Sequence, residues 1–273
     1  MQRTAGGHRK IPIASVIQFL RQTKRELVRP EIIGLPPRAD TVADSMDQAI
    51  EDTLGALAGG DPTQLHGLVF PFYLRGHSLA EICDRLLSPA MHRIGTLWQS
   101  GSLEIFEEHR AVEMMVRLLH DFRLALPESY DGPKAIGGTV DGDRYQLPTQ
   151  MIELSLAEIG WNSTTLGVSL PFHTLLSAAE KNRPKIIWLS VSELADEKPF
   201  VRELREFCAA VPVETIVFFG GRATSDAMEV NTKAVRCHTI QDLVTRAQGL
   251  TTSDAEPGAG TTSTADDVDD ASA

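Results

Sequence analysis

Trp98, Glu108 and His109 are the side chains that first suggest a ligand site. Trp98 closes one helical pattern, and Glu108 and His109 open the next, across the polar loop 99–107. A tryptophan offers a flat apolar lid, and a carboxylate beside an imidazole can bind the polar edge of a ligand. In the alternative, structural interpretation, Trp98 fills core space and the acid at the helix start complements the helix dipole. Spacing alone favours this structural interpretation.

A second group of small and polar residues lies where three predicted strands end. Its candidate cofactor-binding members are Asp143, Tyr145, Ser190, Ser192, Gly220 and Gly221. Small residues at strand ends would let a flat ligand approach the backbone, and hydroxyl groups could bind a nucleotide-like tail. A glycine pair can also serve only to relieve a tight turn. The three loops 141–148, 190–193 and 220–223 are more informative together than any one alone.

The amino-terminal segment carries side chains suited to nucleic acid. Residues 1–30 hold seven basic residues and one acid, although the whole chain has a net charge of -11. A Gly-Gly pair at 6–7 is typical of a tight hairpin turn and predicts a small ribbon with basic edges. As in a winged helix-turn-helix, we expect its DNA contacts to be Arg3, His8, Arg9 and Lys10. A solvated basic face is the alternative.

Several classes of protein are disfavoured. No HExxH, nucleophile elbow or Ser/His/Asp pattern is present, so no enzyme class is predicted. Cys83, Cys208 and Cys237 lack the spacing of a zinc site or a disulfide framework, so we expect core thiols. No apolar run reaches the roughly 20 residues that a membrane helix needs, and no secretory signal is present. A cytoplasmic protein without a membrane partner is therefore expected.

Two units and a linker precede the predicted sheet. Residues 1–28 predict a partial DNA-binding segment, in which the ribbon is followed by an amphipathic helix with apolar residues at helical spacing. Prolines and glycine make 29–41 a linker. Residues 42–126 predict an antiparallel four-helix bundle, with helices at 42–58, 62–75, 78–98 and 104–125.

Residues 133–250 alternate short β-rich runs with helical ones. This pattern predicts an α/β unit, a five-stranded doubly wound parallel sheet of the flavodoxin-like kind, which binds ligands at the carboxyl ends of its strands. The predicted strands are 134–140, 163–168, 185–191, 214–219 and 234–238, and the predicted helices lie near 147–159, 171–182, 197–210, 223–230 and 240–248. Residues 251–273 carry six acids, no base and little apolar surface, so a disordered acidic tail is predicted.

In this order the segments resemble MerR-like transcription regulators with a cobalamin-binding sensor. Residues 3–11 resemble the wing of MerR-like and excisionase-like domains, the Trp98 and Glu108-His109 spacing resembles the helical cap of cobalamin-dependent photoreceptor repressors, and the sheet resembles their cobalamin-binding domain. The resemblance covers about residues 1–250. It implies that the wing contacts promoter DNA, that Trp98 shields adenosylcobalamin, and that Glu108 and His109 lie near the adenosyl group. It also implies a homo-oligomer whose assembly changes with light or ligand.

The sequence departs from that family at its cobalt ligand. Family members carry Asp-x-His-x-x-Gly after the first strand, where this chain has Asp143-Arg-Tyr145-Gln-Leu-Pro148. A phenol with a pKa near 10 is a poor neutral ligand compared with imidazole, so no protein ligand to the metal is expected. Gln99 stands where light-sensing members have a second histidine, so a light-driven switch is not expected. The recognition-helix region is missing, so either the true start lies upstream of Met1 or the wing is a remnant. Because residues 3–27 still show the pattern of a complete wing and helix, we expect an upstream start.

Three hypotheses follow. The first is a DNA-binding transcription regulator whose bundle and sheet sense a corrinoid. The second is a corrinoid carrier for methyl transfer, which tyrosine at position 145 and the basic amino end disfavour. The third is a ligandless dimerisation module.

Overall fold

The computed structural model describes residues 2–3, 9–25, 29–33, 45–127, 131–228 and 233–252. The predicted turn at 6–7, His8, the start of the first predicted bundle helix and the tail from 253 lie outside these ranges. Strand β1 (Gln2–Arg3) pairs antiparallel with β2 (Arg9–Lys10), which confirms the predicted ribbon. Helix α1 (Ile13–Thr23) follows and buries Ile17 and Leu20. Within the predicted linker, residues Pro30–Ile33 form a 3-10 turn, η1.

Four helical rods form the next unit, as predicted. They are α2 (Met46–Gly59), α3 (Pro62–Leu74), the rod α4 (Leu79–Ile82), η2 (Cys83–Leu87) and α5 (Ser88–Gln99), and then α6 (Ile105–Ala125). Side-chain caps fix their starts, since Ser45 accepts a hydrogen bond from the Gln48 N–H and Asp61 accepts one from the Gln64 N–H. The prediction of one regular helix over 78–98 was wrong in detail, because residues 83–87 are π-helical.

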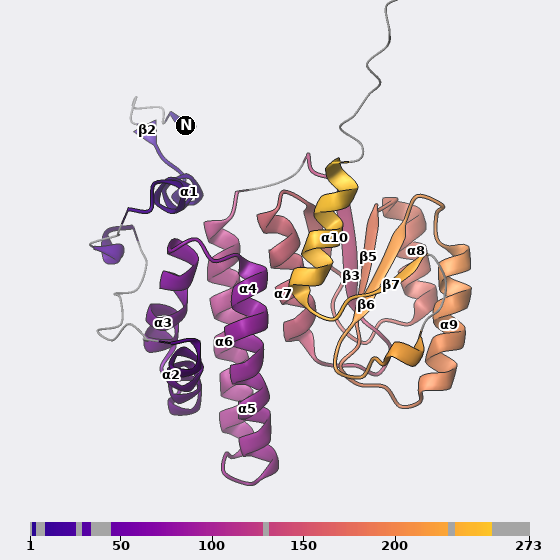
Figure 1. The fold of residues 1–273 in the computed structure, drawn as a ribbon, viewed down its shortest axis with the longest axis horizontal. Coiled ribbons are helices and arrows are strands. Elements are labelled where there is room, and N and C mark those ends of the chain that lie inside the picture. The colour runs from indigo at the N-terminus through magenta and orange to yellow at the C-terminus, as the bar shows by residue number, and fades with distance from the viewer. Residues whose placement is uncertain are drawn as a thin grey trace, which may run out of the picture.

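The sheet unit contains five parallel strands in the order β4-β3-β5-β6-β7. Its elements are β3 (Lys134–Thr139), α7 (Gln146–Glu158), β4 (Asn162–Thr165), α8 (Phe172–Asn182), β5 (Ile186–Ser190), α9 (Glu197–Ala210), β6 (Ile216–Gly220), η3 (Asp226–Met228), β7 (Ala234–Arg236) and α10 (Ile240–Thr252). Helices α7 and α10 lie on one face and α8 and α9 on the other (Figure 1). This confirms the doubly wound fold. The helix predicted at 223–230 was wrong, because the described part of this range, 223–228, contains the 3-10 turn η3 and no α-helix.

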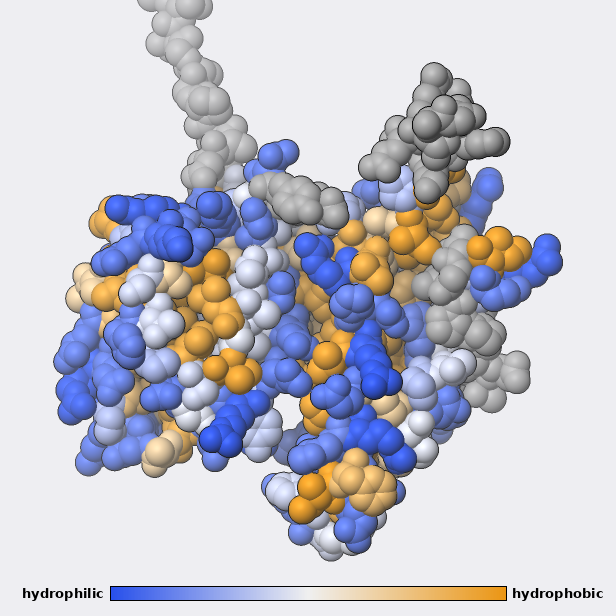
Figure 2. Space-filling model, turned by 180° about the vertical axis from the view of Figure 1, so that it is seen from behind, coloured by the Kyte–Doolittle hydropathy of each residue, from blue (hydrophilic) through white to orange (hydrophobic). Residues whose placement is uncertain are grey.

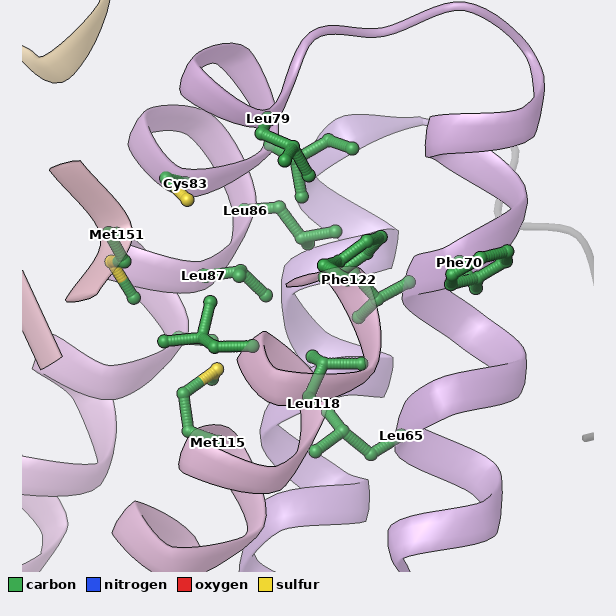
Figure 3. Packing of buried hydrophobic residues seen from close by; sticks show 14 of the residues in the cluster. Leu65, Phe70, Leu79, Cys83, Leu86, Leu87, Met115, Leu118, Phe122 and Met151 are labelled. Carbon is green, nitrogen blue, oxygen red and sulfur yellow. The ribbon is translucent and has the colours of Figure 1, made fainter. Parts of the chain in front are cut away.

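The bundle and the sheet unit share one apolar core. Met151 of α7 points toward Cys83 and Leu87 of the bundle (Figure 3). Leu147, Leu154 and Ala157 of α7 belong to the same cluster as the bundle core. Because α7 is buried from both sides, the two units are expected to hold a fixed relative position.

Polar contacts reinforce this junction at two helix starts. The Asp84 carboxylate accepts the Ile240 and Gln241 N–H groups, at 3.0 and 2.8 Å, and so caps α10. Glu158 of α7 accepts the Leu79 N–H at 2.7 Å and so caps α4. Each unit therefore satisfies backbone donors of the other.

Helix α1 joins the same junction through Arg21. Its guanidinium donates to Glu158 at 3.0 Å and to the backbone carbonyls of Tyr73 and His77, at 3.0 and 3.2 Å. It also lies over the Tyr73 ring, 3.7 Å from the centroid. Burial raises the pKa of Glu158, which the Leu79 N–H and Arg21 oppose.

The three cysteines are free and buried, as predicted. Burial raises the pKa of the Cys208 thiol to about 11, so at neutral pH it is a packed apolar group rather than a reactive thiolate. Within the described ranges, we find no helix with the length and apolar character of a membrane span.

Candidate ligand-binding cleft

A cleft opens between the tip of the bundle and the sheet unit. The turn between α5 and α6 lies at the same end of the molecule as the carboxyl ends of the strands (Figure 1). Seen from behind, a gap separates this tip from the sheet unit, and apolar surface gathers on the tip (Figure 2). The exposed apolar side chains there are Trp98, Ile105 and Phe106, which are 42%, 59% and 64% exposed. We call these three residues the tip patch.

The tip is rigidly built although its side chains are exposed. The Ser102 and Leu103 N–H groups donate to the Leu97 carbonyl at 2.8 and 3.1 Å, which closes the turn. Glu104 and Glu107 form a capping box that starts α6. The alternative that Trp98 fills core space is wrong, because nearly half of its side chain faces solvent.

Glu108 and His109 lie near the start of α6 at the same end of the bundle. The His109 Nε2 atom is 3.6 Å from a Glu108 carboxylate oxygen, and the imidazole is largely exposed. Glu108 lies in the first turn of α6, where its charge complements the helix dipole, as the structural interpretation expects. Ligand binding by Glu108 and His109 stays a prediction.

At the sheet edge, Asp143 is a structural clamp. The residue is fully buried. Its carboxylate accepts the Tyr145 N–H at 2.9 Å on one oxygen and the Ser192 and Glu193 N–H groups, at 2.5 and 3.4 Å, on the other. Backbone donors of this kind satisfy a buried carboxylate. Asp143 therefore ties the loop after β3 to the loop after β5, and these structural hydrogen bonds occupy both of its carboxylate oxygens.

Arg222 joins the third loop to the other two. Its Nε donates to the Ser192 carbonyl at 2.9 Å, and its guanidinium stacks on the Tyr145 ring, 4.5 Å from the centroid. The structure thus brings together all three loops that the sequence singled out. Tyr145 remains 44% exposed at the edge.

Gly220 and Gly221 are required by the packing of the backbone. A Cβ atom at Gly221, which has φ of +132°, would lie 2.3 Å from the Val191 carbonyl oxygen, and one at Gly220 would lie 2.3 Å from the Cys237 carbonyl oxygen. These contacts support the alternative in which the glycine pair relieves a tight turn.

The sequence interpretation missed Trp188 and Arg222. Trp188 is fully buried in β5, and its indole N–H donates to the Thr149 hydroxyl of α7 at 2.8 Å. The available signal was a tryptophan two residues before Ser190 in an otherwise aliphatic strand. Arg222 directly follows the glycine pair, but only the folded loops reveal its stacking on Tyr145.

The helical unit matches a known family. Residues 47–120 match the family described as "B12 binding domain". These residues are therefore similar to a B12-binding domain. They span all of the tip, including Trp98, Glu108 and His109.

Three relatives extend the comparison. A solved corrinoid protein for monomethylamine from Methanosarcina barkeri has a TM-score of 0.57 at 15% identity, over 76% of this chain and 100% of its own, which shows the fold alone. "Dimethylamine corrinoid protein 2" of Methanosarcina acetivorans is 24% identical over 114 residues, 41% of this chain and 53% of that protein. The "HTH-type transcriptional repressor CarH" of Myxococcus xanthus is 26% identical over 144 residues, 51% of this chain and 46% of that protein. The chain spans about half the length of these two curated relatives.

These comparisons support a corrinoid cofactor and give no enzyme among the curated relatives. The tip patch and Tyr145 both offer exposed aromatic surface to a flat ligand. The residues do not fit a corrinoid held by an imidazole from the sheet edge, because the phenol of Tyr145 stacks under Arg222 at that position. Among the described residues, no group of three or more His, Cys, Asp or Glu side chains could hold a metal ion.

Proposed function

We propose that the chain is a DNA-binding transcription regulator that senses a corrinoid in the cleft between the tip patch and the sheet edge. The corrinoid is held by the bundle tip and the edge loops without a protein ligand to cobalt. Ligand binding changes self-association and hence DNA affinity. Residues 1–28 act as the DNA-contacting segment, 42–126 as the cap and 133–250 as the cobalamin-binding-like sheet domain.

The docking of α1 carries this proposal. Arg21 connects the basic segment to both sensor units at once, through Glu158 of α7 and the carbonyls of Tyr73 and His77 around the end of α3. A change in how the bundle meets the sheet therefore acts directly on the helix that follows the basic ribbon. A carrier that presents its corrinoid to another enzyme has no need of a basic ribbon at this junction.

The DNA contact is tested by charge removal on the ribbon. We expect full-length protein to retard a labelled duplex from upstream of its own coding sequence, with affinity that falls as salt rises. The variant Arg9→Ala/Lys10→Ala should bind more weakly, with a salt slope lower by about 2. The matched control is Arg202→Ala/Arg205→Ala on the exposed face of α9, which removes the same charge elsewhere. Equal losses in both variants, or no salt-sensitive binding, would contradict the proposal.

The sensor is tested by retention of adenosylcobalamin. Protein incubated with it in the dark and then desalted should keep the corrinoid absorption spectrum, and Trp98→Ala should lose it. The control Phe19→Ala removes an exposed aromatic ring of α1. Retention by Tyr145→His but not by the wild type would show that the pocket persists while its native ligand is not cobalamin.

A corrinoid carrier is the second candidate, favoured by the fold shared with the Methanosarcina barkeri protein. The two candidates differ in what the bound cofactor does. A carrier loaded with methylcobalamin exchanges its methyl group with an acceptor, whereas a sensor changes its self-association, which light scattering measures. Loss of both behaviours would leave a ligandless dimerisation module.

A further inference from the structure

A ligand bound at the carboxyl ends of the strands could extend further only into the layer between α7 and the sheet or into the layer on the opposite face. We consider the layer between α7 and the sheet. Sheets of this topology bind ligands where the strand order reverses, which here is between β3 and β5. The last residues of the strands on the α7 side are all small. In register they are Thr139, Ser190 and Gly220.

The next row down closes this layer. Two residues deeper, Gly137, Trp188 and Phe218 lie side by side across the same three strands. At about 3.3 Å per residue, this row lies roughly 7 Å below the edge. Trp188 and Phe218 belong to the apolar cluster on the α7 and α10 side. A group that entered from the edge would meet the indole after one row of small residues.

The indole of Trp188 is fixed in place rather than loosely packed. A Cβ atom at Gly137 would lie 2.2 Å from Cδ2 of Trp188, so the absent side chain at 137 is filled by the ring. Its N–H donates to Thr149, whose hydroxyl is 3.1 Å from that of Thr165. The indole N–H, the only polar group of this side chain, is hydrogen-bonded, and Trp188 is 0% exposed. We therefore expect the ring to stay in this position.

We propose that Trp188 determines which corrinoids the cleft accepts. It closes the layer between α7 and the sheet to a ligand tail, so a corrinoid binds through its ring system alone and its nucleotide stays outside the protein. This inference rests on the proposed corrinoid sensor. The chain consequently does not distinguish corrinoids by their lower base.

The wild-type test compares adenosylcobalamin with adenosylcobinamide, which lacks the nucleotide. Titration monitored by quenching of tryptophan fluorescence should give dissociation constants within about tenfold of each other. A preference for adenosylcobalamin of more than tenfold would overturn the role of Trp188 and leave the sensor intact.

The variant test opens the layer. In Trp188→Ala we expect adenosylcobalamin to gain at least about tenfold over adenosylcobinamide. Free indole or benzimidazole should raise the melting temperature of this variant and not of the wild type, because a dry apolar cavity binds a planar ring. Thr174→Ala, at an exposed position of α8, is the control. A folded variant that neither ring stabilises would contradict the closure.

The proposed corrinoid sensor and the proposed role of Trp188 can be contradicted independently of each other. If the wild type retains neither corrinoid but Trp188→Ala retains adenosylcobalamin, the closure by Trp188 is supported and the sensor function is overturned. If neither protein retains either corrinoid, both proposals are overturned.

Discussion

At the scale of single residues, the candidate site residues differ in how far the folded structure already uses them. Asp143 is fully occupied by backbone donors, and the glycine pair is needed by its neighbours. Trp98, His109 and Tyr145 are exposed and remain available. Residue type alone could not distinguish these roles. A carboxylate before a helix gives the same sequence pattern whether it holds two loops together or binds a ligand.

His66 of α3 should make stability fall on acidification. It is buried and stacked on Phe70, with centroids 4.8 Å apart, and its burial lowers the pKa below the usual 6.5, while Asp121 opposes the shift. Above pH 6.5 both the folded and unfolded states hold a neutral imidazole, so this stability is fully present. Below it the unfolded state binds the proton first, and stability is lost as the pH falls through the folded pKa.

The measurement is urea unfolding at a series of pH values for the wild type and His66→Phe. The variant should lose less stability between neutral and mildly acidic pH, and the exposed His92→Gln control should follow the wild type. Parallel curves for the wild type and His66→Phe would show that His66 contributes nothing to the pH dependence.

At the scale of elements, helix ends carry much of the specificity of packing. Asp84 lies in the π-helical turn of the bundle, yet caps α10 of the sheet unit. Burial raises the pKa of its carboxyl, while the N–H groups of Gln241 and Ile240 oppose this. A residue in the irregular π-helical turn therefore contacts the start of a helix that is distant in the sequence.

Removing this cap should loosen α10 selectively. Asp84→Ala leaves two N–H groups of α10 without their acceptor and should cost about 1–2 kcal/mol of unfolding free energy. Hydrogen exchange in 240–252 should accelerate more than in α8. Asp84→Asn keeps an acceptor oxygen and should retain most of the protection; equal exchange in α8 and α10 would contradict the assignment.

The order of the elements and most of their types could be predicted from the sequence, except for the turns η2 and η3, and the contacts between elements could not. Apolar spacing marked the bundle helices and the strands, and cap residues such as Asp61 placed the helix starts within a few residues. The π-helical turn was missed because its apolar residues, Cys83, Leu86 and Leu87, also fit an α-helix. At the site, the three loops were found, but the stacking of Arg222 on Tyr145 and the filling of Gly137 by Trp188 depend on contacts between distant residues.

At the scale of the whole molecule, Arg21 and Glu158 join the amino-terminal segment to both the bundle and the sheet unit. Arg21→Met would leave the mostly buried carboxylate of Glu158 short of a partner and should cost about 2 kcal/mol. Glu158→Gln should cost a similar amount, and the double variant should recover part of it, with a coupling energy of about 1 kcal/mol. Denaturant unfolding of the four proteins measures this.

An exposed ion pair serves as the control for that cycle. Arg246 and Asp242 of α10 lie one turn apart, and Arg246→Met should cost less than about 0.5 kcal/mol. Additive costs for Arg21 and Glu158 would mean that the two residues act independently. The basic segment would then be attached to the bundle and the sheet unit without being energetically coupled to them.

The π-helical turn lets the rod contain one more residue than a regular helix without rotating the bundle tip. Each residue of an α-helix advances the side-chain direction by about 100°, and a π-helical turn adds one residue to the rod. Deleting a single residue within Cys83–Leu87 would therefore give a regular α-helical turn and leave Trp98 on the same side of the rod. The same deletion within α5, before Trp98, would turn Trp98 by about 100° around the rod axis.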